Sequence, residues 1–191
     1  MIMRYLMKIF CILYASLALS SLDSDAQKYS ISTDVLSCAT FGTLNVDASM
    51  ALSSKWSLVA GLRYNPFTFN RSRPDKQFQL RQRSCSLGSR FWPWHFGSGW
   101  WFAGKLRYQE YNMGGLLRRN TREGDRIGAG LYTGYTHMLS AHFNLEFGAG
   151  IWAGNDKYKI YDCPSCGYTE AQGNSFFILP DDIMISIAYV F

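Results

Sequence analysis

The sequence of 191 residues has few features of catalysts, nucleic-acid binders or helical membrane proteins. It holds only 3 His and no Gly-x-Ser-x-Gly motif, and His95, His137 and His142 fall near separate short connections. A base positioned beside a nucleophile, which an envelope protease or acyltransferase needs, is therefore not indicated. The net charge of +5 is not gathered in a long basic run, which makes nucleic acid a poor partner for an exported chain. After residue 26, charges and glycines interrupt every apolar stretch, so no transmembrane helix is expected.

The N-terminus has the pattern of a secretory signal peptide. Arg4 and Lys8 supply positive charge, residues 9–19 form a mostly apolar run, and Ser24-Asp25-Ala26 is a small-x-small cleavage site. The alternative is an uncleaved membrane anchor, but the apolar run is shorter than a spanning helix requires. We therefore expect residues 1–26 to be removed.

Residues 27–191 then form one domain, and their composition favours an all-β fold. The chain has 17 Gly, only 5 Pro, 16% aromatic residues and little helical periodicity. Apolar and polar residues alternate with period 2, the pattern of strands with two different faces. Eight such segments are predicted, at 28–38, 43–52, 55–66, 78–92, 99–110, 125–138, 142–153 and 185–191.

The two faces of these strands predict an eight-stranded antiparallel transmembrane β-barrel of the outer-membrane type. The apolar faces are too large and regular to meet water, and the polar faces are too charged for the interior of a soluble sandwich. A closed barrel in lipid accommodates both, with apolar residues outward and polar residues in the lumen. A soluble, lipocalin-like barrel is the alternative, and it would require the large residues to point inward.

Seven charged residues are predicted to face the lumen as a charge network, which would fill a narrow barrel instead of leaving a water-filled pore. They are Asp34, Asp47, Arg63, Arg90, Lys105, Arg107 and Glu146. A conduction path or proton relay is the alternative role.

Aromatic residues and connection lengths give the expected orientation. Short turns at 53–54, 93–98 and 139–141 alternate with longer connections at 67–77, 111–124 and 154–180, which is the usual periplasmic and extracellular asymmetry. Ile187, Tyr189 and Phe191 end the chain in the pattern that the outer-membrane assembly machinery recognises as an insertion signal. Interfacial girdles are expected from Trp56, Tyr64, Phe67, Trp92, Trp94, Trp100 and Tyr108.

The predicted outer loops carry two further groups of candidate residues. Cys163 and Cys166 favour a local disulfide in an oxidising compartment, with a metal site or a free-thiol role as alternatives. Cys85 is expected to face lipid, and Cys38 to lie near the outer end of the first strand. A basic surface suited to lipopolysaccharide phosphates or acidic glycans is formed by Arg71, Arg73, Lys76, Arg118, Arg119 and Arg122, unless these are ordinary solvated loop residues.

Several motifs resemble a family of small outer-membrane barrels of unknown function from Bacteroidetes. They are the stretches 55–58, 64–69 and 89–92, then Tyr-Asp-Cys-Pro-Ser-Cys-Gly at 161–167 and the terminal Ile-Ala-Tyr-Val-Phe. Proteins of this kind are often encoded near fimbrial genes, so the resemblance implies a link to surface adhesion and implies no known reaction. The basic third loop departs from the family's pattern.

We therefore expect a non-enzymatic outer-membrane β-barrel with an envelope-structural or surface-interaction role and no cofactor. Its expected partners are outer-membrane lipid and lipopolysaccharide, the assembly machinery, and fimbrial or other surface proteins. An outer-membrane enzyme acting on envelope lipid or peptide, or a small pore, are the alternatives.

Overall fold

A computed structural model describes residues 27–39, 42–69, 77–114, 120–162, 168–181 and 183–191. The expected signal peptide lies outside these ranges. So do seven predicted loop residues: Arg71, Arg73, Lys76, Arg118, Arg119, Cys163 and Cys166.

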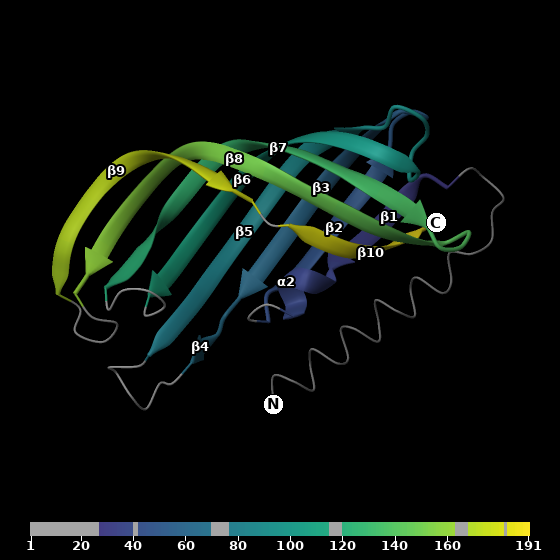
Figure 1. The fold of residues 1–191 in the computed structure, drawn as a ribbon. Helices are drawn as coiled ribbons and strands as arrows, with labels where there is room; N and C mark the ends of the chain where they lie inside the picture. Colours follow the sequence, from purple (N-terminus) through teal and green to yellow (C-terminus); the bar gives the residue numbers. More distant parts are fainter. Residues whose placement is uncertain (1–26, 40–41, 70–76, 115–119, 163–167, 182) are drawn as a thin grey trace.

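The described chain is almost entirely antiparallel β-structure (Figure 1). The strands are β1 (Tyr29–Asp34), β2 (Leu44–Ala51), β3 (Trp56–Asn65), β4 (Thr68–Phe69), β5 (Phe78–Phe91), β6 (Gly99–Gly114), β7 (Thr121–Met138), β8 (Phe143–Tyr161), β9 (Thr169–Pro180) and β10 (Met184–Val190). One short helix, α2 (Val35–Ala39), follows β1. No helix among the described residues is long and apolar enough to cross a membrane.

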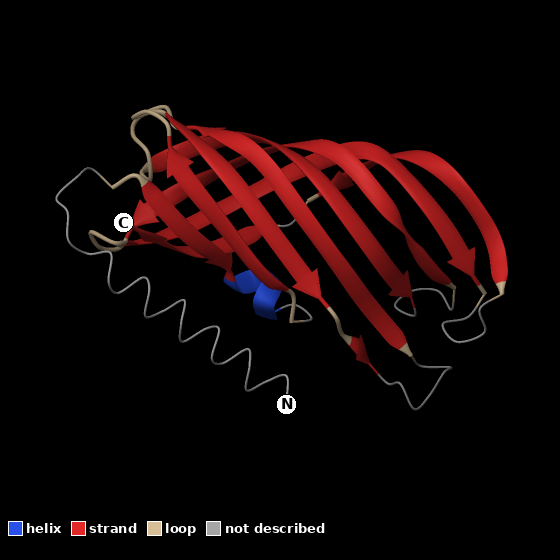
Figure 2. Ribbon diagram, turned by 180° about the vertical axis from the view of Figure 1, so that it is seen from behind, coloured by secondary structure: helices blue, strands red, loops and turns tan. Residues whose placement is uncertain are grey.

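Eight of the strands close into a ring, which Figure 2 shows from behind. The order is β10-β1-β2-β3-β5-β6-β7-β8, and β8 pairs with β10 to complete the circuit. The long strand β8 has two partners on one side. Its first part, Phe143–Gly148, pairs with β10, and its second part, Ile151–Tyr161, pairs with β9. The ring therefore has an end formed by short turns and an opposite end at which β6, β7, β8 and β9 extend furthest.

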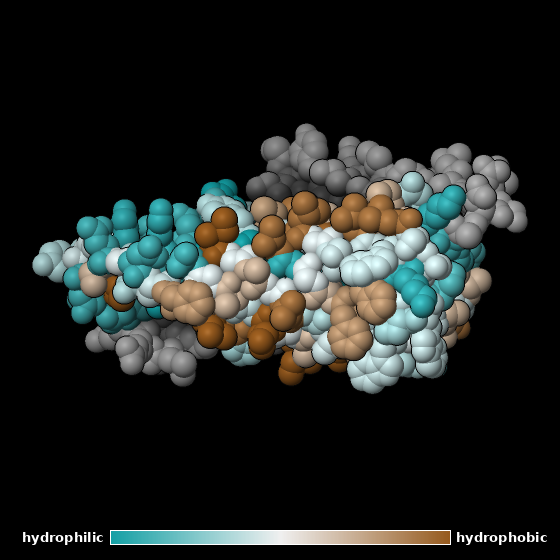
Figure 3. Space-filling model, turned by 90° about the horizontal axis from the view of Figure 1, so that it is seen from above, coloured by the Kyte–Doolittle hydropathy of each residue, from teal (hydrophilic) through white to brown (hydrophobic). Residues whose placement is uncertain are grey.

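The alternating sequence pattern sets which side chains face outward. Leu62, Leu106 and Leu131 are 60%, 67% and 70% exposed, whereas inward neighbours such as Lys105 and Tyr132 are buried. Figure 3 shows the resulting apolar band on one face, with a hydrophilic end on the left. We call this band the apolar belt, and its members include Val46, Leu62, Leu87, Leu106, Ile127, Leu131, Ile151 and Ile187. Large residues thus point away from the ring, opposite to the lipocalin-like arrangement.

A row of charged side chains ends the apolar belt on the extended side. Arg83, Glu110, Asp125 and Lys157 occupy one register across β5, β6, β7 and β8, and Arg83 forms an ion pair with Glu110. We call the end of the ring beyond this row the outer end.

The structure corrects three expectations about the elements. The predicted first strand, 28–38, stops at Asp34 and continues as α2. The predicted long connections 111–124 and 154–180 are largely strand, because β6, β7 and β8 run beyond the belt and β9 follows. Above the belt both faces of a strand are polar, so the alternation that identifies strands disappears from the sequence.

Aromatic side chains close the ring at its turn end, and we call Trp92, Phe96 and Trp101 the aromatic plug. Trp92 and Trp101 are 1% and 0% exposed, and Phe96 packs edge-on against Trp92 at 5.7 Å. Gly97 and Gly99 adopt φ of +77° and +74°, which lets the connection after β5 fold back into the ring. The prediction that Trp92 belongs to an outward girdle is therefore wrong, and its indole instead donates to Ser57 Oγ at 3.1 Å inside the ring.

Candidate functional site

Ion pairs occupy the interior above the aromatic plug, and two of them join residues predicted to face the lumen. Arg90 donates to Glu146 at 3.0 Å, and both side chains are almost completely buried. The Arg90 guanidinium also lies 4.3 Å from the Trp101 ring centroid. One step outward along β6, Lys105 Nζ is 3.9 Å from Asp47.

The next layer brings Arg107 to a carboxylate that the sequence pattern did not indicate. Arg107 donates to Asp181 Oδ1 at 2.7 Å, and the Tyr132 hydroxyl donates to Asp181 Oδ2 at 2.6 Å. Asp181 follows β9, at the point where the chain passes from β9 to β10. Its position was missed because it falls between the connection expected at 154–180 and the strand expected from residue 185, where no lumen-facing residue was predicted.

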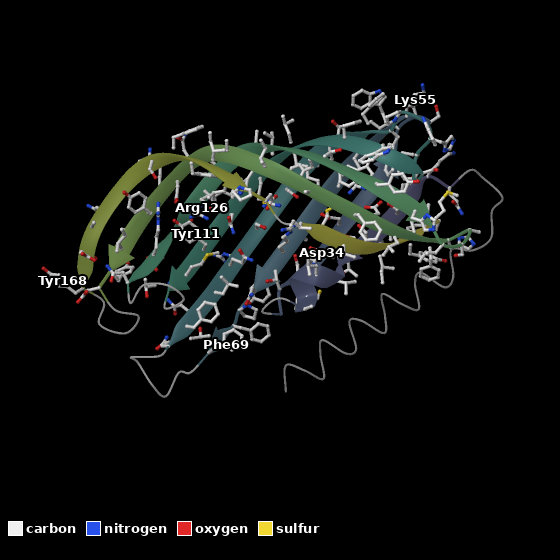
Figure 4. All side chains as sticks on the ribbon, in the orientation of Figure 1. Asp34, Lys55, Phe69, Tyr111, Arg126 and Tyr168 are labelled. Carbon is white, nitrogen blue, oxygen red and sulfur yellow. The ribbon has the colours of Figure 1, made fainter. Side chains whose placement is uncertain are left out.

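Around the charged row, four inward-facing side chains from β6, β7 and β8 form what we call the mouth cluster. Its centre is Asp156, which is 1% exposed. Asp156 accepts hydrogen bonds from the Tyr111 hydroxyl at 2.8 Å, from Arg122 at 2.9 Å and from Arg126 at 3.1 Å. Figure 4 shows Tyr111 and Arg126 close together inside the ring. Two guanidinium groups share one carboxylate, so the cluster carries a formal charge of +1.

Aromatic stacking orients both arginines of the mouth cluster. The Arg126 guanidinium lies 3.9 Å from the Tyr111 ring centroid, and the Arg122 guanidinium lies 4.0 Å from that of Tyr158. Tyr111 lies beside the charged row and therefore beyond the apolar belt. Burial raises the pKa of Tyr111 to about 12, so the phenol stays protonated and donates to Asp156.

A cavity of about 830 Å³ lies next to the mouth cluster and is bounded by β3, β5, β6, β7, β8 and β9. Its inward-facing lining includes Asn65, Gln82, Tyr111, Tyr158 and Gly173. We call this space the mouth cavity. Amide groups, phenols and a net positive cluster suit it to polar or anionic groups rather than to apolar ones.

Two predicted residues, Asp34 and Arg122, have different surroundings from those expected. Asp34 forms no ion pair among the described residues; its carboxylate accepts hydrogen bonds from Leu36, Ser37 and Ile185. Arg122 lies in β7 and faces the ring interior, not a basic loop surface. Arg63 is half-buried on the inward side of β3.

The terminal residues and the cysteines lie where their strands place them. Ile187 is 43% exposed on the outward face of β10, and Tyr189 stacks on Phe191 at 6.0 Å. Cys85 is exposed on the outward face of β5, and Cys38 lies in α2; neither is in a disulfide. Within the described ranges, no cluster of three or more His, Cys, Asp or Glu side chains could hold a metal ion.

These observations define a class: an all-β protein whose antiparallel sheet closes into a ring of eight strands, with charged residues inside and apolar residues outside. The family described as "Protein of unknown function (DUF3575)" matches residues 9–191, and the chain belongs to this family. No curated protein matches the chain, and no solved structure does.

Proposed function

We propose that the protein is a non-enzymatic β-barrel of the bacterial outer membrane with a surface-interaction or envelope-structural role. In this proposal the ring of strands spans the membrane, the short turns lie in the periplasm, and the mouth cavity faces the cell exterior.

The observation that carries the proposal is the apolar belt. Its leucine and isoleucine side chains are mostly more than half exposed, and together with Val46 they come from seven of the eight ring strands. A monomer in water rarely exposes a contiguous apolar surface of this extent, whereas lipid stabilises it. Tyr64, Trp94 and Trp100 are exposed near the strand ends, which supports interfacial anchoring.

The interior favours a sealed barrel over the alternative of a small pore. The aromatic plug closes the turn end, and successive layers of ion pairs fill the space between it and the mouth cavity. Such an interior stabilises the wall and leaves only the outer end open to a ligand.

The mouth cavity supports binding better than catalysis. Its lining among the described residues contains no Ser, Cys or His, and His95, His137 and His142 lie at the opposite, turn end of the ring. Acyl transfer of the serine or cysteine type requires such a nucleophile beside a base. The partners we propose are outer-membrane lipid and lipopolysaccharide, the assembly machinery, and surface proteins. A link to fimbriae of Bacteroidetes rests on the resemblance of the sequence motifs.

Heat modifiability of the mature protein tests the membrane location. A closed lipid-embedded barrel keeps its compact shape in detergent until it is boiled, so the unboiled band should migrate differently from the boiled one. Fractionation of the cells should recover the same protein with the outer membrane. A single band under both conditions, together with recovery in the soluble periplasmic fraction, would contradict the proposal.

A further inference from the structure

Strand β9 is the last strand in the sheet order, and within the described ranges only one of its edges is paired. Its neighbour is β8, which it follows from Thr169 to Pro180. Below it, β10 takes over the pairing with β8 and also pairs with β1, so the ring is closed there. On the other edge of β9, no strand among the described residues pairs with it.

The register identifies which backbone groups this edge presents. Asp181 N–H donates to Gly150 C=O at 2.8 Å, next to the pair Ile151–Pro180. In an antiparallel ladder the bonding direction alternates from residue to residue, so even-numbered residues of β9 point their N–H and C=O away from β8. Pro180 fits this parity, because a proline without an N–H is tolerated on the free side of an edge strand. We call the groups of Gln172, Asn174, Phe176 and Ile178 the free edge.

Part of the free edge lies at the level of the apolar belt. Phe176 and Ile178 point outward and are 68% and 66% exposed. The register aligns Phe176 with Asn155 of β8, which in turn pairs with the belt residue Ile127. In lipid, backbone N–H and C=O groups without partners are strongly unfavourable, and an open sheet edge there is not stable.

Where the ring is open beside β9, the opposite side is formed by β1 and β2, and the backbone groups of these strands have partners there. β1 ends at Asp34, and the Asn45 side chain of β2 bonds both backbone groups of this last residue: its Oδ1 accepts from Asp34 N–H at 2.6 Å, and its Nδ2 donates to Asp34 C=O at 2.9 Å. Beyond Asp34, α2 takes the place of β1 beside β2, where Thr43 N–H donates to Ser37 C=O at 3.2 Å. No described side chain forms such hydrogen bonds with the free-edge N–H and C=O groups of β9, so these groups lack partners among the described residues.

We propose that the free edge of β9 is a binding site for an extended strand from another envelope protein. This inference rests on the proposed outer-membrane location. An extended backbone is the ligand that supplies alternating C=O and N–H groups at strand spacing along this length. Its side chains are apolar beside Phe176 and Ile178, which face lipid, and polar beside Gln172 and Asn174.

A second copy of the chain fits this edge poorly. Copies inserted in the same direction bring their β9 strands together in parallel, with the same residues at the same height. N–H groups then face N–H groups, whereas a parallel ladder requires the groups of the two strands to interleave.

Substitutions in β9 separate the free edge from the paired one. Asn174→Pro removes an N–H of the free edge and leaves the ladder to β8 intact, while Ser175→Pro removes an N–H that the ladder uses. Asn174→Ala changes the side chain and keeps the N–H. Asn174→Pro and Asn174→Ala should keep the heat-induced band shift of the wild type, and Ser175→Pro should lower the temperature at which it occurs.

Hydrogen exchange measured by mass spectrometry on residues 172–178 then tests occupancy. We expect the free-edge amides to exchange at least about 10-fold more slowly in native outer-membrane vesicles than in the purified protein in detergent. Asn174→Pro in vesicles should exchange like the purified protein, and Asn174→Ala like the wild type. Equal exchange rates of the free-edge amides in vesicles and in detergent overturn the inference. If both rates are fast, the free edge has no partner in vesicles. If both rates are slow, the chain itself covers the free edge.

Cross-linking from a benzoylphenylalanine placed at Gln172 identifies the occupant class. The expected adduct contains one different polypeptide and is lost in Asn174→Pro but not in Asn174→Ala. An adduct of two copies of this chain overturns the inference in favour of self-association. If the protein is absent from outer-membrane vesicles, the proposed function itself is contradicted. If the protein is present there but its free-edge amides are unprotected from exchange, only the proposed strand-binding site is contradicted.

Discussion

Asp34 joins two segments that are 151 positions apart: its Oδ1 accepts a hydrogen bond from the backbone N–H of Ile185 at 3.1 Å. The same oxygen accepts from Leu36 N–H at 3.1 Å, and the other carboxylate oxygen accepts from the Ser37 hydroxyl. One side chain thus links the end of β1, the start of α2 and the start of β10. β1 and β10 are the shortest strands of the ring, and their pairing completes the circuit of hydrogen bonds.

Replacing Asp34 should therefore loosen the closure of the ring. Asp34→Ala leaves the Leu36 and Ile185 N–H groups without their acceptor, and we expect it to lower the free energy of unfolding by about 1–3 kcal/mol. Asp34→Asn keeps one acceptor oxygen and should lose less. Urea unfolding in detergent micelles measures both. The exposed Asp162 is the matched control, and a loss in Asp162→Ala as large as that in Asp34→Ala would contradict the assignment.

Asp34 also illustrates where sequence reasoning succeeded and where it failed. The period-2 pattern predicted the directions of Leu62, Leu106 and Ile187, because alternation is a local property of an extended chain. The same pattern extended the first strand through Val35. A signal for α2 was present, since Asp34 and Ser37 have the spacing of a helix N-cap, but the β-branched residues Ile31, Thr33 and Val35 at alternating positions outweighed it.

The mouth cluster could not be predicted for a different physical reason. Asp156 and Arg122 flank the charged row that ends the apolar belt, where the inward and outward residues of the strands have similar polarity. Only the register of β7 and β8 brings them together, and register is a long-range property. The Arg90–Glu146 pair was within reach of prediction because both residues lie at belt level, where an inward charge contrasts with its apolar neighbours.

Loss of Glu146 should be among the most damaging single substitutions in the interior. Glu146→Ala leaves Arg90 buried without a counter-charge, and we expect a loss of about 3–5 kcal/mol in the free energy of unfolding. The double variant Arg90→Met with Glu146→Met should recover most of it, because both charges are then absent. Glu170→Ala, at an exposed position, should stay within about 0.5 kcal/mol of the wild type. A double variant no more stable than the single one would show that the loss has another cause.

The plugged interior predicts that the protein does not conduct ions. Trp92 and Trp101 close the turn end, and the Arg90–Glu146 pair lies directly above them. Liposomes that contain the mature protein should retain a trapped fluorescent anion as well as protein-free liposomes do, while liposomes with a general porin lose it. Stable, discrete current steps in a planar bilayer would favour the pore alternative.

Tyr111 should make the stability depend on pH at the alkaline end. Its pKa is about 12 in the folded chain, above the value of about 10 for an unfolded one. The stabilisation is complete below about pH 10 and decreases as pH rises toward 12, because the unfolded chain ionises first. Tyr111→Phe should therefore lose less stability than the wild type between about pH 10 and pH 12. Tyr168→Phe, at a residue that is 73% exposed, should leave the wild-type pH dependence unchanged.

A charge placed on the apolar belt distinguishes lipid from water as the surroundings of the ring. Leu131 is 70% exposed, and a substitution at so exposed a site in a water-soluble protein usually changes stability by less than about 0.5 kcal/mol. If the belt lies in a bilayer, Leu131→Arg should instead cost about 2–4 kcal/mol, because the guanidinium loses its hydration near the midplane. Gln172→Arg, on the exposed outer part of β9, is the matched control and should be close to neutral. Unfolding in lipid vesicles gives both values, and equal, small effects of the two arginines would mean that the belt does not face lipid.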